Sequence, residues 1–113
     1  MQAPADPLDA GLALAAAFDA HTISYALGGA LAYGVWGIPR ATLDVDVNVF
    51  IEDAELPRLA RALASLGIAV DQARMAHESA TKGLIVVRFG IFRVDVFTPS
   101  IAFSREAERT RRE

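Results

Sequence analysis

Three aspartates occupy positions from which their side chains could act together. Asp44 and Asp46 are two residues apart, and Asp95 lies in a second alternating run over residues 92–97. Residues two apart on a β-strand point to the same face, with Cα atoms about 6–7 Å apart. If the two runs form neighbouring strands, the three carboxylates converge and repel one another, unless a hard cation such as Mg²⁺ or Mn²⁺ binds them. The spacing therefore predicts a two-metal site for phosphoryl transfer.

A glycine pair, Gly28 and Gly29, precedes Asp44 by about 15 residues. We expect the pair to lie between a strand and a helix. Glycines there let the backbone approach a phosphate closely, and the amides that begin the next helix add a positive dipole end. The combination of Gly-Gly with Asp-x-Asp on the next strand therefore predicts a triphosphate site. Lys82 is a weaker candidate for contact with the same phosphates.

Hydrophobic periodicity and turn residues predict the elements that must position these side chains. Asp6 can cap a first helix whose apolar face would contain Leu8, Leu12 and Phe18. The strongest strand pattern runs from Leu43 to Ile51, where every second residue is apolar. We expect helices over residues 6–20, 30–36 and 53–66, strands over 24–27, 43–51, 84–89 and 91–97 with a tight turn at Gly90, a loop or frayed helical turn over 71–83, and a polar tail over 104–113.

The predicted order is α-β-α-β-α-β-β-α, which indicates an α+β domain with a mixed β-sheet and helices packed against it. The 113 residues fit one domain over 1–113, and their 53% hydrophobic content is enough for a modest core. No cysteine is present, which excludes a disulfide, a thiolate–zinc site and a cysteine nucleophile. The net charge of −3 means that any nucleic-acid acceptor would need a local basic patch. The lack of an apolar run long enough to span a membrane and of a signal-like start favours a cytoplasmic protein.

The run from Leu27 to Ala30, followed by Gly37, Arg40, Thr42 and Asp44-Val45-Asp46-Val47, resembles the core pattern of a known family. It is similar to the DNA polymerase β-like nucleotidyltransferase superfamily, and in particular to the minimal bacterial branch related to AbiEii-type toxins. The similarity covers roughly residues 10–100.

The resemblance implies an enzyme that transfers a nucleoside monophosphate from a nucleoside triphosphate, ATP or another, to an acceptor and releases pyrophosphate. In it, Asp44 and Asp46 hold the metal ions, and Asp95 completes one metal site and helps to deprotonate the acceptor hydroxyl. Gly28 and Gly29 cradle the triphosphate. The same resemblance implies that Arg40 and Thr42 stabilise either the bound phosphates or the loop before the strand.

Relatives of this kind usually continue with a further strand and helices that complete the base pocket. We therefore expect this chain to be a fragment, a truncated form, or a protomer that borrows surface from a second copy or an antitoxin-like partner. The acceptor stays open between RNA, a protein side chain and a small molecule.

Each signal also has a simpler reading. Asp44 and Asp46 could be incidental acids on a solvent-facing strand, Gly28-Gly29 a tight turn, and Arg40 a loop residue paired with a surface acid. Asp95 could form an ion pair with Arg93, which lies on the same strand face. Two other functions stay open: a catalytically silent domain that binds a partner, and a phosphatase or nuclease that uses the same acids with water.

Overall fold

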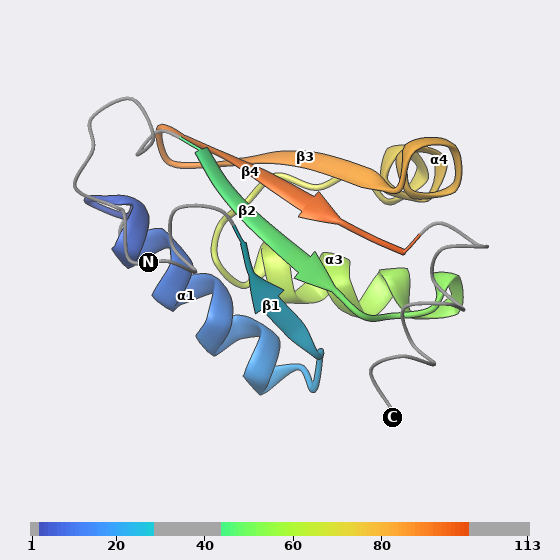
Figure 1. The fold of residues 1–113 in the computed structure, drawn as a ribbon, viewed down its shortest axis with the longest axis horizontal. Helices are drawn as coiled ribbons and strands as arrows, with labels where there is room; N and C mark the ends of the chain where they lie inside the picture. Colours follow the sequence, from blue (N-terminus) through green and yellow to red (C-terminus); the bar gives the residue numbers. More distant parts are fainter. Residues whose placement is uncertain (1–2, 29–43, 100–113) are drawn as a thin grey trace.

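The fold is seen in a computed structural model, which describes residues 3–28 and 44–99. Its elements, in chain order, are the helix α1 (Pro7–Ala20), the strands β1 (Tyr25–Leu27) and β2 (Asp44–Val49), the 3₁₀ turn η1 (Asp53–Glu55), the helices α3 (Leu56–Ala64) and α4 (Gln72–Lys82), and the strands β3 (Leu84–Phe89) and β4 (Phe92–Phe97). The expected α+β class, with a mixed sheet and packed helices, is confirmed (Figure 1).

The four strands form one sheet in the order β1-β2-β4-β3. β1 pairs with β2 antiparallel, β2 with β4 parallel, and β4 with β3 antiparallel. The tight β3–β4 connection predicted at Gly90 is confirmed, and this glycine has a φ of 63°, a conformation that disfavours other residues. Because two strands far apart in the sequence, β2 and β4, are central neighbours, residues near 45 and near 95 lie side by side.

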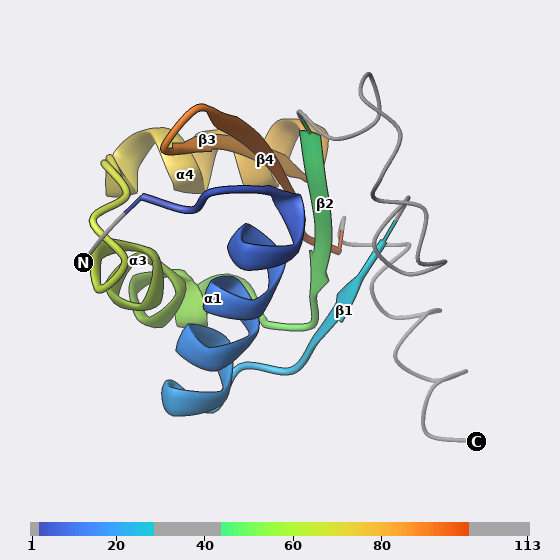
Figure 2. The same cartoon turned by 90° about the vertical axis from the view of Figure 1, so that its left-hand side faces the viewer.

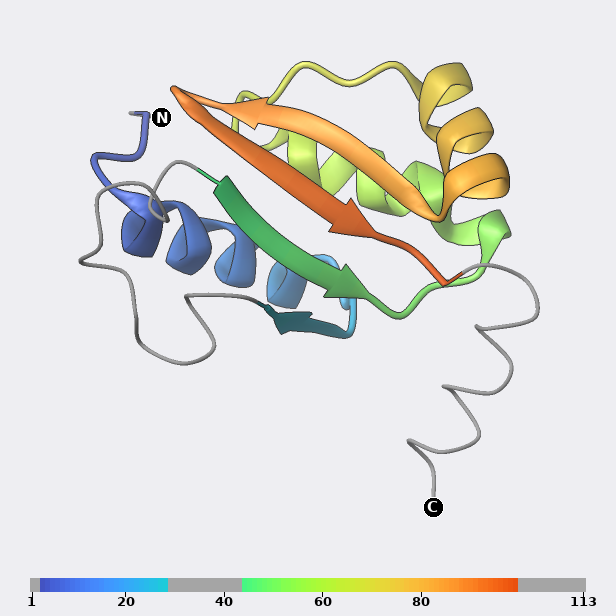
Figure 3. The same cartoon turned by 45° about the horizontal axis from the view of Figure 1, so that its top comes forward.

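The described helices cover one face of the sheet (Figure 2). The apolar residues of β2 and β4 and the buried sides of α1 and α3 form a single core cluster, with Phe18, Phe92, Leu14, Leu59 and Leu63 among its fully buried side chains. Figure 3 shows the strands in front of α1 and α3. The opposite face of the sheet, which no described helix covers, is called the open face below.

Helix α1 begins as predicted but packs through other residues. Asp6 caps it, because its side chain accepts a hydrogen bond of 2.8 Å from the amide of Asp9. Phe18 is fully buried, whereas Leu12 is 59% exposed, so the expected apolar face is wrong at Leu12. The side of the helix that faces the core combines small residues with the large side chains of Leu14 and Phe18. Its buried positions are Pro7, Ala10, Gly11, Leu14, Ala17 and Phe18.

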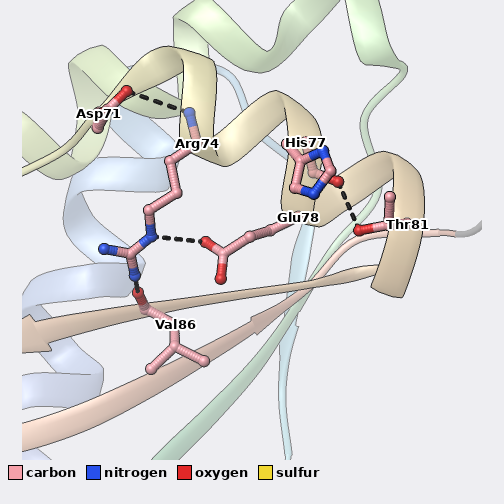
Figure 4. A network of polar contacts seen from close by, with 6 residues as sticks. All are labelled: Asp71, Arg74, His77, Glu78, Thr81 and Val86. Atoms are coloured by element: carbon pink, nitrogen blue, oxygen red, sulfur yellow. Dashed lines mark hydrogen bonds and ion pairs between the residues drawn. The ribbon is translucent and has the colours of Figure 1, made fainter.

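Helix α4 corrects the expectation of a loop or frayed turn over residues 71–83. Asp71 caps its first turn and Gly83, with a φ of 65°, ends it in the left-handed conformation. Arg74 ties the helix to the sheet: its Nε donates to Glu78 Oε1 at 3.1 Å and its Nη2 donates to the carbonyl of Val86 at 2.9 Å (Figure 4). The predicted element order therefore lacked one helix.

The other predicted elements differ only in their ends or lie outside the described residues. The expected helix over 53–66 is η1 followed by α3, and its Leu56, Leu59, Leu63 and Leu66 are buried as expected. The expected helix over 30–36 and the polar tail over 104–113 lie outside the described residues.

Candidate functional site

Strand β2 has an apolar side and a polar side, as its alternation predicts. Val45, Val47 and Val49 are fully buried against the helices. Asp44, Asp46 and Asn48 alternate with them and therefore lie on the open face. Burial of three valines fixes the register of this strand, because a shift of one residue would expose them all. The same packing that stabilises the sheet thus holds the two aspartates away from the core.

Strand β4 brings the third aspartate beside the second. In the parallel β2–β4 pair, Asp46 is opposite Asp95 and Asp44 is opposite Arg93. Val94 and Val96 are fully buried, so Asp95 also lies on the open face. The prediction that the two aspartate-bearing strands are neighbours is confirmed. The three aspartates and Arg93 therefore form one patch on this face, which we call the acidic patch.

Gly28 borders the acidic patch from the other side of β2. Its amide donates a hydrogen bond of 2.9 Å to the carbonyl of Asp46, which extends the β1–β2 pairing by one residue. A Cβ added at Gly28 would lie 3.5 Å from Asp46 Cβ and 3.7 Å from Asn48 Nδ2, both ordinary contacts, and Gly28 is not among the described glycines with positive φ. Neither packing nor backbone conformation within the described residues therefore requires glycine here.

The carboxylates of the patch act on one another electrostatically. Partial burial raises the pKa of Asp46 above its ordinary value, and the negative charges of Asp95 and Asp44 raise it further. The positive charge of Arg93 opposes these effects. A bound cation would oppose these effects on Asp46, which is both partly buried and flanked by like charges.

Arg93 is bound to Asp95. Its Nε donates to Asp95 Oδ1 at 2.7 Å, and the two side chains are 45% and 17% exposed, respectively. The hydrogen bond and the charge of Asp95 raise the pKa of Arg93. The ion pair considered as the simpler reading of Asp95 is therefore present.

The patch supplies the hard carboxylate oxygens that magnesium prefers. Within residues 3–28 and 44–99, however, no three His, Cys, Asp or Glu side chains gather closely enough to hold a metal ion. The chemistry of the donors fits a divalent cation, whereas the described side chains do not form a group that could hold one.

The remaining four candidates either lie outside the described residues or lie away from this patch. Gly29, Arg40 and Thr42 lie outside the described residues. Lys82 is exposed in the last turn of α4, in the helix layer, and it is not among the charges that shift the pKa of Asp46.

Two residues at the site were not proposed for it from the sequence. Asn48 continues the polar side of β2 and lies next to Gly28. Its position two residues after Asp46 is the signal that could have identified it. The sequence suggested Arg93 only as an ion-pair partner of Asp95. In the structure it lies opposite Asp44 and interacts electrostatically with all three aspartates.

A separate groove of about 310 Å³ lies between α4 and the outer strand β3. Arg74, Met75, Glu78 and Val86 are among the residues that line it, and none of the three aspartates is. We assign it no part in the chemistry of the acidic patch.

No helix in the described part of the chain is long and apolar enough to cross a membrane. Comparisons of the chain with protein-family models, with curated proteins and with solved structures found no match.

Proposed function

We propose that this chain is the core of a metal-dependent nucleotidyltransferase. The observation that carries the proposal is the juxtaposition of Gly28, which directly follows β1, with Asp46 of β2 and Asp95 of β4. A glycine lets phosphates approach the backbone closely, and the neighbouring carboxylates supply oxygen ligands for the metal that accompanies the phosphates. The likeness of the sequence pattern to nucleotidyltransferases supports the same reading.

In this proposal Asp44, Asp46 and Asp95 would hold Mg²⁺ or Mn²⁺, which neutralises charge on the transferring phosphoryl group. Asp95 would also accept the proton of the attacking hydroxyl. Gly28, together with Gly29, would let the backbone approach the triphosphate. Catalysis would then depend mainly on positioning and on electrostatic stabilisation of the transition state.

The glycine favours transfer of a nucleotide over hydrolysis. Within the described residues, nothing about the fold demands glycine at position 28, so a close approach by a ligand is a reason for it. A phosphatase or nuclease that used the same acids with water would not need a triphosphate cradle. The acceptor is a hydroxyl of RNA, protein or a small molecule, and we propose that the enzyme acts in the cytoplasm, where nucleoside triphosphates are available.

The proposal is tested by following the label of a nucleoside triphosphate. The protein is incubated with Mg²⁺, candidate acceptors and triphosphates labelled at the α- or the γ-phosphorus. We expect the α-label to appear on an acceptor and the γ-label to appear in pyrophosphate. Asp44→Asn should lower transfer at least about 100-fold, because loss of even an outer partner of a metal ligand commonly costs 10–100-fold.

Asp19→Asn is the matched control, because Asp19 is an exposed acid on α1 and lies outside the acidic patch. Wild-type transfer by Asp44→Asn would exclude this assignment. Release of the γ-label as phosphate, with no labelled acceptor, would instead indicate a hydrolase.

The second candidate is a catalytically silent domain that binds a partner, such as a second copy or an antitoxin-like protein. The Arg93–Asp95 ion pair favours it, because a carboxylate neutralised by arginine does not need a metal. The two candidates differ in a simple respect: the silent domain would bind no nucleoside triphosphate in the presence of Mg²⁺.

A further inference from the structure

Beyond the acidic patch, four residues form a row across the open face. Phe97 of β4 lies opposite Asn48 of β2 on one side and opposite Leu84 of β3 on the other. Ala26 of β1 lies opposite Asn48 and completes the row. Its two central members lie two residues further along β2 and β4 than the aspartates that face each other in the patch, about 6–7 Å from them. The row thus adds an uncharged surface to the same sheet face.

Phe97 places an aromatic ring on this surface. It is 37% exposed, whereas Phe18, Phe89 and Phe92 are at most 3% exposed. Val96 is fully buried, so the alternation of β4 directs Phe97 to the open face. An exposed ring on an uncovered sheet is a surface on which a planar heterocycle stacks, and nucleobases bind to sheet proteins in this way.

Asn48 places unpaired hydrogen-bonding groups beside the ring. Its side chain is exposed and makes no hydrogen bond with any residue that the structure describes. A carboxamide carries an NH₂ donor and a C=O acceptor. These two groups match the N7 acceptor and the N6 donor on one edge of adenine, with which asparagine forms paired hydrogen bonds. The ring and the adjacent free carboxamide together provide the contacts that recognise an adenine base.

The row also lies within reach of the phosphate end proposed for the nucleotide. A Cβ added at Gly28 would lie 3.7 Å from Asn48 Nδ2, so Asn48 lies between Gly28 and Phe97. Gly28 and Phe97 are two strands and two register positions apart, about 12 Å from the spacing and rise of strands. An extended nucleoside triphosphate spans that separation between its base and its phosphates.

We propose that Phe97 and Asn48 bind the base of the nucleotide: Phe97 stacks on it, and Asn48 forms hydrogen bonds with the edge of adenine. The inference rests on the proposed function for the identity of the ligand, and it names adenine nucleotides as the substrate class. Both contacts are made by uncharged groups and involve no metal ion. They can therefore be measured with nucleosides, which lack phosphates.

The test measures the affinity of the protein for adenosine, guanosine, cytidine and uridine in EDTA. The chemical shifts of the Asn48 side-chain amide and the Phe97 backbone amide report binding at the row. Phe97→Leu removes the ring but keeps an apolar side chain, Phe97→Tyr keeps the ring, and Asn48→Ala removes the carboxamide. Leu12→Ala is the matched control, because Leu12 is a large apolar residue that is 59% exposed on α1, in the helix layer.

The wild type should bind adenosine at least about fivefold more tightly than the other three nucleosides, the lower end of the discrimination that a paired contact gives. Phe97→Leu should weaken binding of all four at least about fivefold, because stacking does not depend on the base, and Phe97→Tyr should bind like the wild type. Asn48→Ala should weaken binding of adenosine to the level of the others and change those three by less than about twofold. Leu12→Ala should leave every affinity within about twofold of the wild-type value, because it lies away from the row.

Nucleoside affinities that Phe97→Leu leaves unchanged, or a base preference that Asn48→Ala leaves unchanged, would overturn the inference. So would a wild-type protein that binds no nucleoside. The proposed function is judged separately, by transfer of the α-label. Transfer at the wild-type KM by both Phe97→Leu and Asn48→Ala would refute the base site and leave the transferase assignment intact, whereas adenosine binding without any transfer would retain the base site and contradict the transferase.

Discussion

Asp46, among the described residues, lies in surroundings that disfavour its charged form. Burial raises its pKa, and the neighbouring carboxylates of Asp95 and Asp44 raise it further. A raised pKa means that the folded protein holds this proton more tightly than the unfolded chain does. The resulting stabilisation is fully present below the ordinary pKa of 3.8 and is lost as the pH rises through the folded-state pKa. At neutral pH the charged side chain therefore opposes folding.

Asp46→Asn should consequently be more stable than the wild type at pH 7, because asparagine cannot ionise. The site is partly exposed, so the gain should be below about 1 kcal/mol, and the rise in midpoint below the roughly 4–8 °C that 1 kcal/mol gives in a domain of this size. Thermal unfolding at pH 7 and at pH 3 measures the effect. The gain should shrink at pH 3; equal destabilisation at both pH values would argue against the electrostatic account.

The stability expected of Asp46→Asn bears on whether Asp46 has a structural role or a functional one. A partly buried acid with a raised pKa that lies beside two other acids is a candidate ligand of the proposed cation. Aspartate is also a poor strand former, so its presence at two positions of β2 has no local structural benefit. At the scale of the residue, Asp46 is therefore the member of the acidic patch on which the stability prediction is made.

At the scale of elements, β2 and β4 could be predicted from the sequence because burial imposes strict alternation on them. Asp44 and Asp95 could be assigned to the polar side for the same reason. The bond between Arg93 and Asp95 could be considered but not decided, since it depends on side-chain orientation that alternation does not specify. The parallel pairing of these two strands, which lie far apart in the sequence, comes from the structure alone.

Helix α4 was missed for a physical reason. Only Met75 and Ser79 of its eleven residues are buried, so the segment has little of the apolar periodicity that predicts a helix. Its ends were nevertheless marked by Asp71 as the N-cap and Gly83 as the C-terminal glycine. Leu12 shows the converse. Its apolar side chain suggested burial, but the packed side of α1 is formed by other residues, Leu14 and Phe18 among them, and Leu12 is 59% exposed.

A buried hydrogen bond links α4 to the residue after β4. Ser79 Oγ and Thr98 Oγ1 are 2.7 Å apart, and the two residues are only 3% and 7% exposed. Ser79→Ala should cost about 1–3 kcal/mol, because it leaves the Thr98 hydroxyl buried without this partner. Thr98→Val should have a similar effect for the reciprocal reason.

The double variant Ser79→Ala/Thr98→Val should cost less than the sum of the single changes, because both partners are then apolar. Urea unfolding of the wild type, both single variants and the double variant gives the coupling. Strictly additive changes in the free energy of unfolding would mean that this bond does not connect the helix to the sheet.

At the scale of the whole molecule, the residues that form the core and those of the proposed site lie on opposite faces of one sheet. The described helices pack on one face and form the core, whereas the acidic patch and Gly28 lie on the other. Small substitutions on the open face should therefore alter ligand binding while leaving the fold intact. Gly28→Ala is the sharpest such change, since the added methyl makes only ordinary contacts at 3.5 Å and beyond.

The most direct test of the account is a calorimetric titration of the wild type and Gly28→Ala with each nucleoside triphosphate, with and without Mg²⁺. We expect the wild type to bind at least one triphosphate only when Mg²⁺ is present. Gly28→Ala should bind it at least about tenfold more weakly, the effect of losing about 1.4 kcal/mol, with an unchanged unfolding midpoint. Binding that is independent of Mg²⁺, equal affinity in both proteins, or no binding to any triphosphate would contradict the account.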